Sequence, residues 1–231
     1  MKTRKLTTLL LALLMIVAAA FTLAACGGGG GKGDPYEYGD AKSYINTKLT
    51  GDYSITYKFG ASENGQVSDS SYYKTVRTAQ GFYFSAESDS ASDLDTSGAL
   101  YIKDGNKYYS YTYSSSESKF KKYGDEALDA EYVEDSLVYL SSWFMAFYGI
   151  YGSDEMKPAG SEKVAGRTCN KYTYKYGIPL IGSVQYNFSI DKETGVCMKF
   201  SYKGKAMGDS AGITFECTEF LTSGVSLPAY A

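Results

Sequence analysis

Hydrophobic and polar residues alternate in short runs along most of the chain, a pattern typical of strands that bury one face. Aromatic and β-branched side chains dominate these runs, and they suit a pleated, half-buried surface. The pattern predicts strands at residues 53–59, 71–77, 81–86, 99–103, 107–113, 169–176, 184–190, 196–203 and 212–220. Because short loops separate most consecutive strands, we expect antiparallel neighbours in one long meandering sheet.

Two helices are expected beside these strands. Asp40 can cap a short helix that ends near Lys48. A longer helix is expected to begin near Asp125 and to end near Tyr148, with its acidic residues in the first half and no charge in residues 136–153. Because the second half is apolar nearly all round, it needs cover on more than one side. The cover could be the sheet together with a loop, another helix, a lipid-like ligand or a membrane surface; complete burial within the domain is the plain alternative.

The first 25 residues have the layout of a secretory signal. Lys2, Arg4 and Lys5 precede an uncharged run at 6–25 that ends in small residues. About 20 apolar residues can also span a bilayer, but threonines interrupt this run and no basic cluster follows it. We therefore interpret residues 1–25 as a signal peptide and expect the chain to be exported.

The four residues 23–26, Leu-Ala-Ala-Cys, resemble the lipobox of bacterial lipoproteins. The resemblance implies that Cys26 receives a diacylglyceryl group and becomes the mature N-terminus, and two acyl chains hold a protein stably at a membrane. Residues 26–35 then form a lipidated, glycine-rich tether, because consecutive glycines favour a flexible coil. A phosphate-binding glycine loop is the alternative, but the Gly-Lys-Ser/Thr spacing of such loops is missing.

Composition excludes several kinds of chemistry. The sequence contains no histidine, which removes Ser-His-Asp and Cys-His catalysis and most zinc sites. Without the signal, 20 basic residues face 26 acidic ones, which argues against nucleic acid as a partner. No other constellation of nucleophile, base or metal ligands stands out, so we expect neither enzymatic activity nor a cofactor.

Three segments of the second half look like the closing strands of clostridial LolA-like proteins: residues 164–167 leading into Cys169, residues 189–195 and residues 215–220. Together with the anchor, the tether, a first helix before the strands and an apolar helix before the last ones, they make residues 36–231 resemble the LolA-like superfamily. This superfamily includes lipoprotein carriers and envelope lipoproteins of Gram-positive bacteria, and the Gram-positive type is the one that the chain resembles. The resemblance implies an α+β fold: a curved antiparallel sheet, or open half-barrel, with one long and one short helix on its concave side.

The family resemblance also implies an apolar cavity for acyl chains. A lipoprotein held at the extracytoplasmic face of the cell membrane would bind a lipid or another amphiphilic ligand there, without shuttling between membranes. Helix spacing and strand alternation select the candidate lining residues Trp143, Phe144, Phe147, Tyr148, Phe59, Phe82, Phe84 and Phe200. Ordinary core packing is the alternative role for each of them.

A second functional hypothesis is a non-catalytic interaction or adhesion module on the cell surface. The chain has 24 tyrosines, and aromatic rings exposed on a strand can stack on sugars or proteins. Tyr108, Tyr109, Tyr111 and Tyr113 would form such a strip if they all faced solvent.

Three cysteines remain besides Cys26. Alternation places Cys169 and Cys197 on faces that also carry lysines, and Cys217 on a face with Ile213 and Phe215. A meander separates Cys169 from Cys197 by one strand, about 9–10 Å, which is too far for a disulfide. We therefore expect free thiols that pack as small apolar residues, with a disulfide, a redox site or a metal site as alternatives.

Overall fold

The computed structural model describes residues 51–64, 66–85, 91–96, 98–129, 157–178, 182–206 and 209–231. The expected signal, Cys26, the tether and the short helix at 40–48 lie outside these residues. Most of the expected long helix does as well, including Trp143, Phe144, Phe147 and Tyr148. In the described part, no helix has the length and apolar character that crossing a membrane requires.

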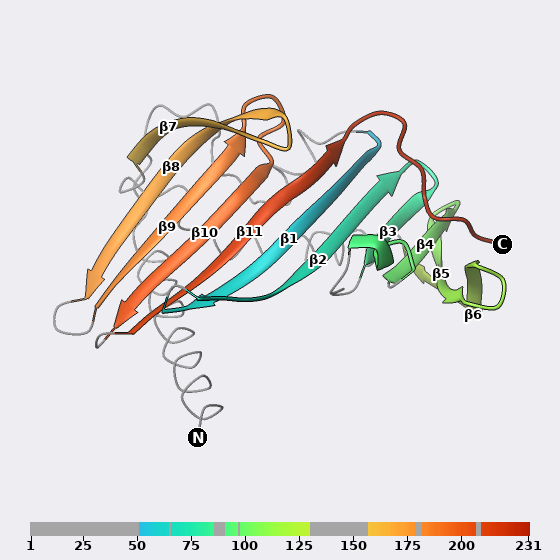
Figure 1. Ribbon diagram of the computed structural model, residues 1–231. Helices are drawn as coiled ribbons and strands as arrows, with labels where there is room; N and C mark the ends of the chain where they lie inside the picture. Colours follow the sequence, from blue (N-terminus) through green and yellow to red (C-terminus); the bar gives the residue numbers. More distant parts are fainter. Residues whose placement is uncertain are drawn as a thin grey trace, which may run out of the picture.

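The described residues form one large antiparallel sheet of 11 strands (Figure 1). Its order is β6-β5-β4-β3-β2-β1-β11-β10-β9-β8-β7. The strands are β1 Tyr53–Glu63, β2 Gln66–Thr78, β3 Gly81–Ser85, β4 Gly98–Asp104, β5 Lys107–Ser114, β6 Lys119–Asp129, β7 Lys157–Val164, β8 Arg167–Ile178, β9 Gly182–Asp191, β10 Cys197–Ala206 and β11 Asp209–Leu221. A short 3-10 helix, η1 Ala91–Asp93, lies between β3 and β4 in the sequence.

Two meanders meet at the centre of this sheet. Consecutive strands pair with each other within the run β1–β6, and the same holds within the run β7–β11. The predicted meander is thus confirmed within each run, but β6 and β7 lie at opposite edges. The two runs are joined by β1 and β11, where Phe59 pairs with Phe215. The sheet is open because each edge strand has one strand neighbour.

The strands expected from alternation are all present, whereas β6 and β7 were not predicted. Every residue of β7 except Glu162 and Val164 is exposed, so the strand lacks the alternation that reveals a buried face. Exposed charged residues are common on edge strands, where they discourage pairing with other chains. The exposed, charged sequence of β7 is therefore typical of an edge strand, but it lacks the alternation from which a strand can be predicted.

The expected start of the long helix near Asp125 is wrong. Residues 125–129 belong to β6, where Ala127 pairs with Tyr109 and Leu128 with Tyr108. Leu128 also packs against the buried Phe82 and Tyr108. Backbone pairing and this apolar contact outweigh the acidic pattern that suggested a helix N-terminus, because helix propensity is a weak preference beside tertiary contacts.

The β7 end of the sheet is strongly curled. Four strand spacings separate β7 from β11, about 19 Å in a flat sheet, yet Cα atoms of these strands approach within 8 Å. Val164 of β7 shares a buried cluster with Met198 of β10 and Phe220 of β11. Figure 1 shows β7 arching across the ends of the neighbouring strands.

The chain after β11 packs against the other half of the sheet (Figure 1). Val225 and Leu227 contact a buried cluster formed by Val76, Tyr83, Leu100 and Phe120 of β2, β3, β4 and β6. The Phe120 N–H donates to the Ala229 carbonyl at 2.8 Å, and the Ala231 N–H donates to the Phe120 carbonyl at 2.9 Å. The C-terminal tail, residues 222–231, therefore covers one face of this half and bonds to edge strand β6.

Candidate ligand-binding face

Aromatic side chains run in register across one face of five neighbouring strands. Tyr172 of β8 pairs with Phe188 of β9, which pairs with Phe200 of β10. The row continues through Phe215 of β11 to Phe59 of β1. Because paired residues point to the same side of a sheet, one row of rings crosses the whole region. We call this side of β8–β11 and β1 the aromatic face.

A second row follows the first along the same face. Tyr174 of β8 pairs with Tyr186 of β9, which pairs with Tyr202 of β10, and Tyr202 pairs with Ile213 of β11. The Tyr186 and Tyr202 ring centroids lie 5.2 Å apart, and Tyr174 lies 5.9 Å from Tyr186. In the first row, Phe188 and Phe200 lie 5.2 Å apart. These spacings are those of favourable aromatic pairs.

The centre of the aromatic face is shielded from solvent. Phe200 is fully buried, and Phe188, Tyr186 and Tyr202 are exposed by no more than 2%. Among the described residues, every apolar member of this cluster is a residue of the sheet itself. The aromatic rows therefore form a continuous apolar surface of the sheet.

The tyrosines place hydroxyl groups within this apolar surface. The Tyr202 hydroxyl is buried and has no hydrogen-bond partner among the described residues. Burial raises the pKa of Tyr202 to about 12. Burial also raises the pKa of Tyr186, with neighbouring tyrosines adding to the effect. Both phenols are neutral at physiological pH and can donate a hydrogen bond.

The opposite side of the same strands is polar. Asn187 accepts hydrogen bonds from Gln185 at 2.8 Å and from Thr173 at 3.2 Å, and it donates to Ser201 at 3.0 Å. Glu216 forms an ion pair of 2.7 Å with the neighbouring Lys199. This half of the sheet is therefore amphipathic, as the alternation in its sequence predicts.

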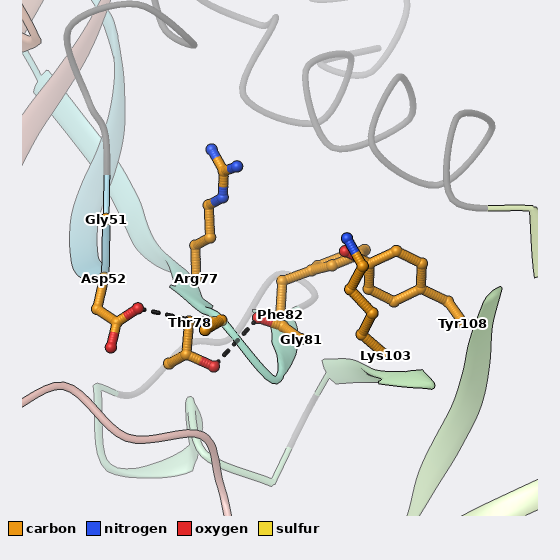
Figure 2. Close-up of a pocket in the computed structure, with 9 residues that line it drawn as sticks. Gly51, Asp52, Arg77, Thr78, Gly81, Phe82, Lys103 and Tyr108 are labelled. Atoms are coloured by element: carbon orange, nitrogen blue, oxygen red, sulfur yellow. Dashed lines mark hydrogen bonds between the residues drawn. The ribbon is translucent and has the colours of Figure 1, made fainter. Parts of the chain in front are cut away.

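A separate hollow of about 180 Å³ lies at the turn ends of β2–β3 and β4–β5 (Figure 2). Phe82 and Tyr108 form apolar walls, and Arg77 and Lys103 contribute positive charge. The Thr78 hydroxyl donates to the Gly81 carbonyl at 3.4 Å within the intervening turn. The remaining lining residues are Gly51, Asp52 and Ala79.

The structure divides the predicted lining residues among different places. Phe59 and Phe200 belong to the cluster of the aromatic face, so the structure brings these two together. Phe82 lies in another cluster and lines the hollow in Figure 2. Phe84 is half-buried on β3. The four helix residues lie outside the described part of the chain, so a lining role for these residues stays a prediction.

Several residues of the aromatic face were not selected from the sequence. Tyr172, Tyr186, Phe188, Tyr202 and Phe215 all lie in strands whose alternation was recognised. Their periodicity indicated the correct strands, but the register between strands was needed to align them into rows.

The four tyrosines of β5 do not form a solvent-facing strip. Tyr108 is buried against Phe82, while Tyr111 and Tyr113 pack beside the cluster that the C-terminal tail covers. Tyr109 is half-buried, and the Lys122 ammonium lies 4.0 Å from its ring centroid. The arrangement expected for the adhesion hypothesis is therefore absent from β5.

Cys169, Cys197 and Cys217 are free and buried. As expected, one strand, β9, separates Cys169 from Cys197. The expectation that Cys197 shares a face with lysines is wrong. A bulge between Cys197 and Lys199 shifts the alternation, so Cys197 pairs with Ile190 and belongs to the buried cluster of the aromatic face. Sequence periodicity cannot reveal an extra residue in one strand.

Burial makes all three thiols weak acids. It raises the pKa of Cys197 and of Cys217 to about 12 each. Burial and the nearby Asp191 raise the pKa of Cys169 to about 11. Thiolate is the nucleophilic and metal-binding form, so these side chains act as apolar packing groups at neutral pH. In the described residues, no three His, Cys, Asp or Glu side chains are arranged to hold a metal ion.

No family model and no curated protein matches the sequence. The fold is similar to solved structures that include the Pseudomonas aeruginosa MucA/MucB complex, at 14% identity and a TM-score of 0.34. That match covers 81% of this chain but 59% of the other, so the chain spans less than two thirds of MucB.

Two further similar structures match over most of both chains. LprF from Mycobacterium bovis has 9% identity and a TM-score of 0.38, with 81% of this chain and 93% of LprF covered. A LolA superfamily protein from Nitrosomonas europaea has 7% identity and a TM-score of 0.25, with 80% and 91% covered. At TM-scores below 0.5, membership of the LolA-like superfamily stays a prediction from the sequence.

Proposed function

We propose that this chain is a lipoprotein that binds a lipid or another amphiphilic molecule against the aromatic face. The observation that carries the proposal is the pair of in-register aromatic rows across β8–β11 and β1, set over a polar opposite face. A broad, continuous apolar surface suits a hydrocarbon tail, because dispersion and hydrophobic burial both increase with contact area. Protonated tyrosine side chains, such as that of Tyr202, carry no charge that would oppose an apolar tail.

The location of the protein is part of the same proposal. A diacylglyceryl group on Cys26 would hold the domain at the extracytoplasmic face of the cell membrane, with the glycine-rich residues 27–33 as the tether. Two acyl chains are sufficient for stable attachment. This arrangement fits a LolA-like lipoprotein of the Gram-positive type and places the binding face next to a source of lipid.

The proposed role is non-catalytic. The raised pKa values keep Cys169, Cys197 and Cys217 protonated, which removes the three thiols as activated nucleophiles. The sequence has no histidine to act as a general base. The protein would therefore hold or present an amphiphile without changing it.

The test uses the mature chain, residues 26–231, with the lipid-bearing thiol removed by Cys26→Ser. Organic extracts of the purified protein are analysed by mass spectrometry, and a fluorescent fatty acid is titrated into the delipidated protein. We expect bound lipid in the extract and saturable uptake of the probe. A folded protein that carries nothing and takes up no amphiphile would overturn the proposal.

A matched pair of variants locates the binding surface. Tyr174 is half-buried on the aromatic face, whereas Tyr123 is 68% exposed on edge strand β6. Tyr174→Ala is expected to weaken probe binding by about three- to tenfold, because one aromatic contact is lost. Tyr123→Ala should leave it unchanged. Equal effects of the two variants would place binding elsewhere.

A further inference from the structure

Two positively charged side chains lie beside the hollow at the turn ends of β2–β3 and β4–β5. Arg77 closes β2 and Lys103 lies near the end of β4, and both line the hollow with Phe82 and Tyr108. Figure 2 shows the Arg77 and Lys103 side chains extending to the same side of the Thr78–Gly81 turn. Their nitrogen atoms therefore approach one space from two different strands.

The hollow has an excess of positive charge. Its third charged residue, Asp52, accepts a hydrogen bond from the Ala79 N–H at 3.1 Å and so supports the turn. None of the ion pairs in the described part of the chain involves Arg77. Arg77 instead bonds the Tyr53 phenol, which faces it across β1 and β2. An anion entering the hollow could therefore pair with a guanidinium that no carboxylate of the described residues neutralises.

The aromatic walls strengthen this attraction. Phe82 is 2% exposed, and its ring stacks on Tyr101 with centroids 4.8 Å apart. The Lys103 ammonium lies 5.5 Å from the Tyr108 ring centroid. Apolar walls reduce the local dielectric response, so charges attract each other more strongly here than in bulk water.

The size of the hollow favours a headgroup over a tail. A cavity of about 150 Å³ can hold one benzene-sized molecule, and the hollow, at about 180 Å³, is of similar size. This volume suits one carboxylate or phosphate group, whereas it is too small for an acyl chain. The guanidinium fork of Arg77 matches the geometry of either anion.

The hollow and the aromatic face lie on the same side of the sheet. Tyr53, the partner of Arg77, and Phe59, the end of the first aromatic row, are separated by six positions on β1 and therefore face the same way. Their Cα atoms are about 20 Å apart at 3.3 Å per residue. One acyl chain spans about 15 Å, half of a bilayer's hydrocarbon core, so a tail that extends from the hollow along β1 covers most of the distance to Phe59, the near end of the first aromatic row.

We propose that Arg77 and Lys103 bind the anionic headgroup of the amphiphile, whose apolar part extends toward the aromatic face. This assignment rests on the proposed function and adds a chemical class: the ligand carries a carboxylate or a phosphate rather than a neutral or cationic headgroup. The occupant is the headgroup of a lipid, and a free inorganic anion is the outcome that the test must separate from it.

The test compares a fatty acid with its methyl ester, which has the same tail and no charge. Both are titrated into the mature chain carrying Cys26→Ser, and the measurement is repeated with Arg77→Gln and with Lys103→Gln. Each variant is expected to weaken binding of the acid about tenfold and to change binding of the ester by less than about twofold. Arg77→Lys, which keeps the charge, should restore part of the affinity.

Controls separate the possible outcomes. Lys205→Gln removes a lysine that is exposed on β10, outside the hollow, and should leave both affinities unchanged. If Arg77→Gln weakens the affinities for the acid and the ester equally, the headgroup assignment is overturned, whereas the proposal that the protein binds an amphiphile still stands. Inorganic phosphate that binds as tightly as the fatty acid and displaces it would identify a free anion and overturn the lipid assignment. Failure of the unmutated chain to bind either acid or ester would instead overturn the proposed function.

Discussion

The two halves of the sheet bury their aromatic residues in different ways. In the β2–β6 half, Tyr83, Leu100 and Phe120 form a cluster that the C-terminal tail covers through Val225 and Leu227. In the β8–β11 half, the aromatic rows run along the sheet, and the apolar members of their cluster that the structure describes are all strand residues. The first half takes its cover from the C-terminal tail, whereas the described neighbours of the buried rings in the second half are residues of the sheet.

The two halves of the sheet also differ in how their polar and charged side chains are paired. On the polar side of the β8–β11 half, Asn187 forms side-chain hydrogen bonds with Gln185 and Ser201, and Lys199 forms an ion pair with Glu216. At the boundary of the β2–β6 half, Arg77 has no carboxylate partner of this kind in the described chain. In the proposed binding mode, the aromatic rows supply apolar contact area, and the turn ends of β2–β3 and β4–β5 supply selectivity for charge.

The largest expected effect comes from uncovering the β2–β6 half. The double variant Val225→Ala, Leu227→Ala removes the apolar contacts of the C-terminal tail and should lower the free energy of unfolding by about 2–4 kcal/mol. Because these residues do not touch the aromatic face, fatty acid affinity should stay the same. Chemical denaturation and probe titration measure the two effects. Loss of affinity without loss of stability would contradict the division between the halves.

A smaller effect is expected at the end of the β8–β11 half, at the buried Asp191. Burial alone would raise the pKa of this carboxyl, but hydrogen bonds from Arg167 and Thr194 outweigh it and lower the pKa below 3.8. The Arg167 contact is 2.8 Å long. The folded state therefore gains stability that is present above about pH 4 and lost as the pH falls through the lowered pKa.

The variant Asp191→Asn tests this linkage. It should lower the free energy of unfolding at pH 7 by about 1–3 kcal/mol, since a charged buried hydrogen bond is lost, and flatten the stability profile below pH 4. Glu193→Gln is the matched control, because Glu193 contacts the same arginine but its side chain is 81% exposed. The control should cost less than about 1 kcal/mol. An unchanged acid profile in Asp191→Asn would refute the assignment.

The smallest effect is expected from Tyr202→Phe on the aromatic face. The Tyr202 hydroxyl is buried without a partner among the described residues, so its removal should change the stability of the ligand-free protein by no more than about 1 kcal/mol, in either direction. Because the proposed headgroup site lies at Arg77 and Lys103, away from Tyr202, fatty acid affinity should change by less than about twofold. Denaturation and titration of the same samples separate these contributions. A stability loss above about 2 kcal/mol would show that the hydroxyl has a structural role.

Much of the strand content was predictable because alternation is a local property. The runs around Phe59, Phe82 and Phe200 show their period of two directly in the sequence, and each became a strand. The two errors in the predicted secondary structure also have local causes. Edge strand β7 has almost no buried residue, and residues 125–129 have a helix-like charge pattern that pairing with β5 overrides.

The candidate site was predictable only in part. Alternation identified residues that face an apolar side, including Phe59 and Phe200, but the sequence could not say which strands are neighbours. The pairing of β1 with β11 joins Tyr57 to Cys217, far apart in the chain. The shared position of Arg77 and Lys103 at one hollow could not be predicted, because the two residues lie on different strands and are brought there only by the β2–β3 and β4–β5 hairpins.

The sequence by itself determined the local features of this protein: which segments become strands, which side of each strand is apolar, and the lipobox-like residues around Cys26. Tertiary structure decided the rest, namely strand order, the bulge that turns Cys197 inward, the alignment of rings into rows and the placement of Arg77 and Lys103 at one hollow. The physical reason is that side-chain alternation depends on backbone geometry within one strand. The register between strands and the choice of neighbouring strands depend on contacts between residues that are distant in the chain. The free energy of these contacts is gained only when the whole sheet assembles.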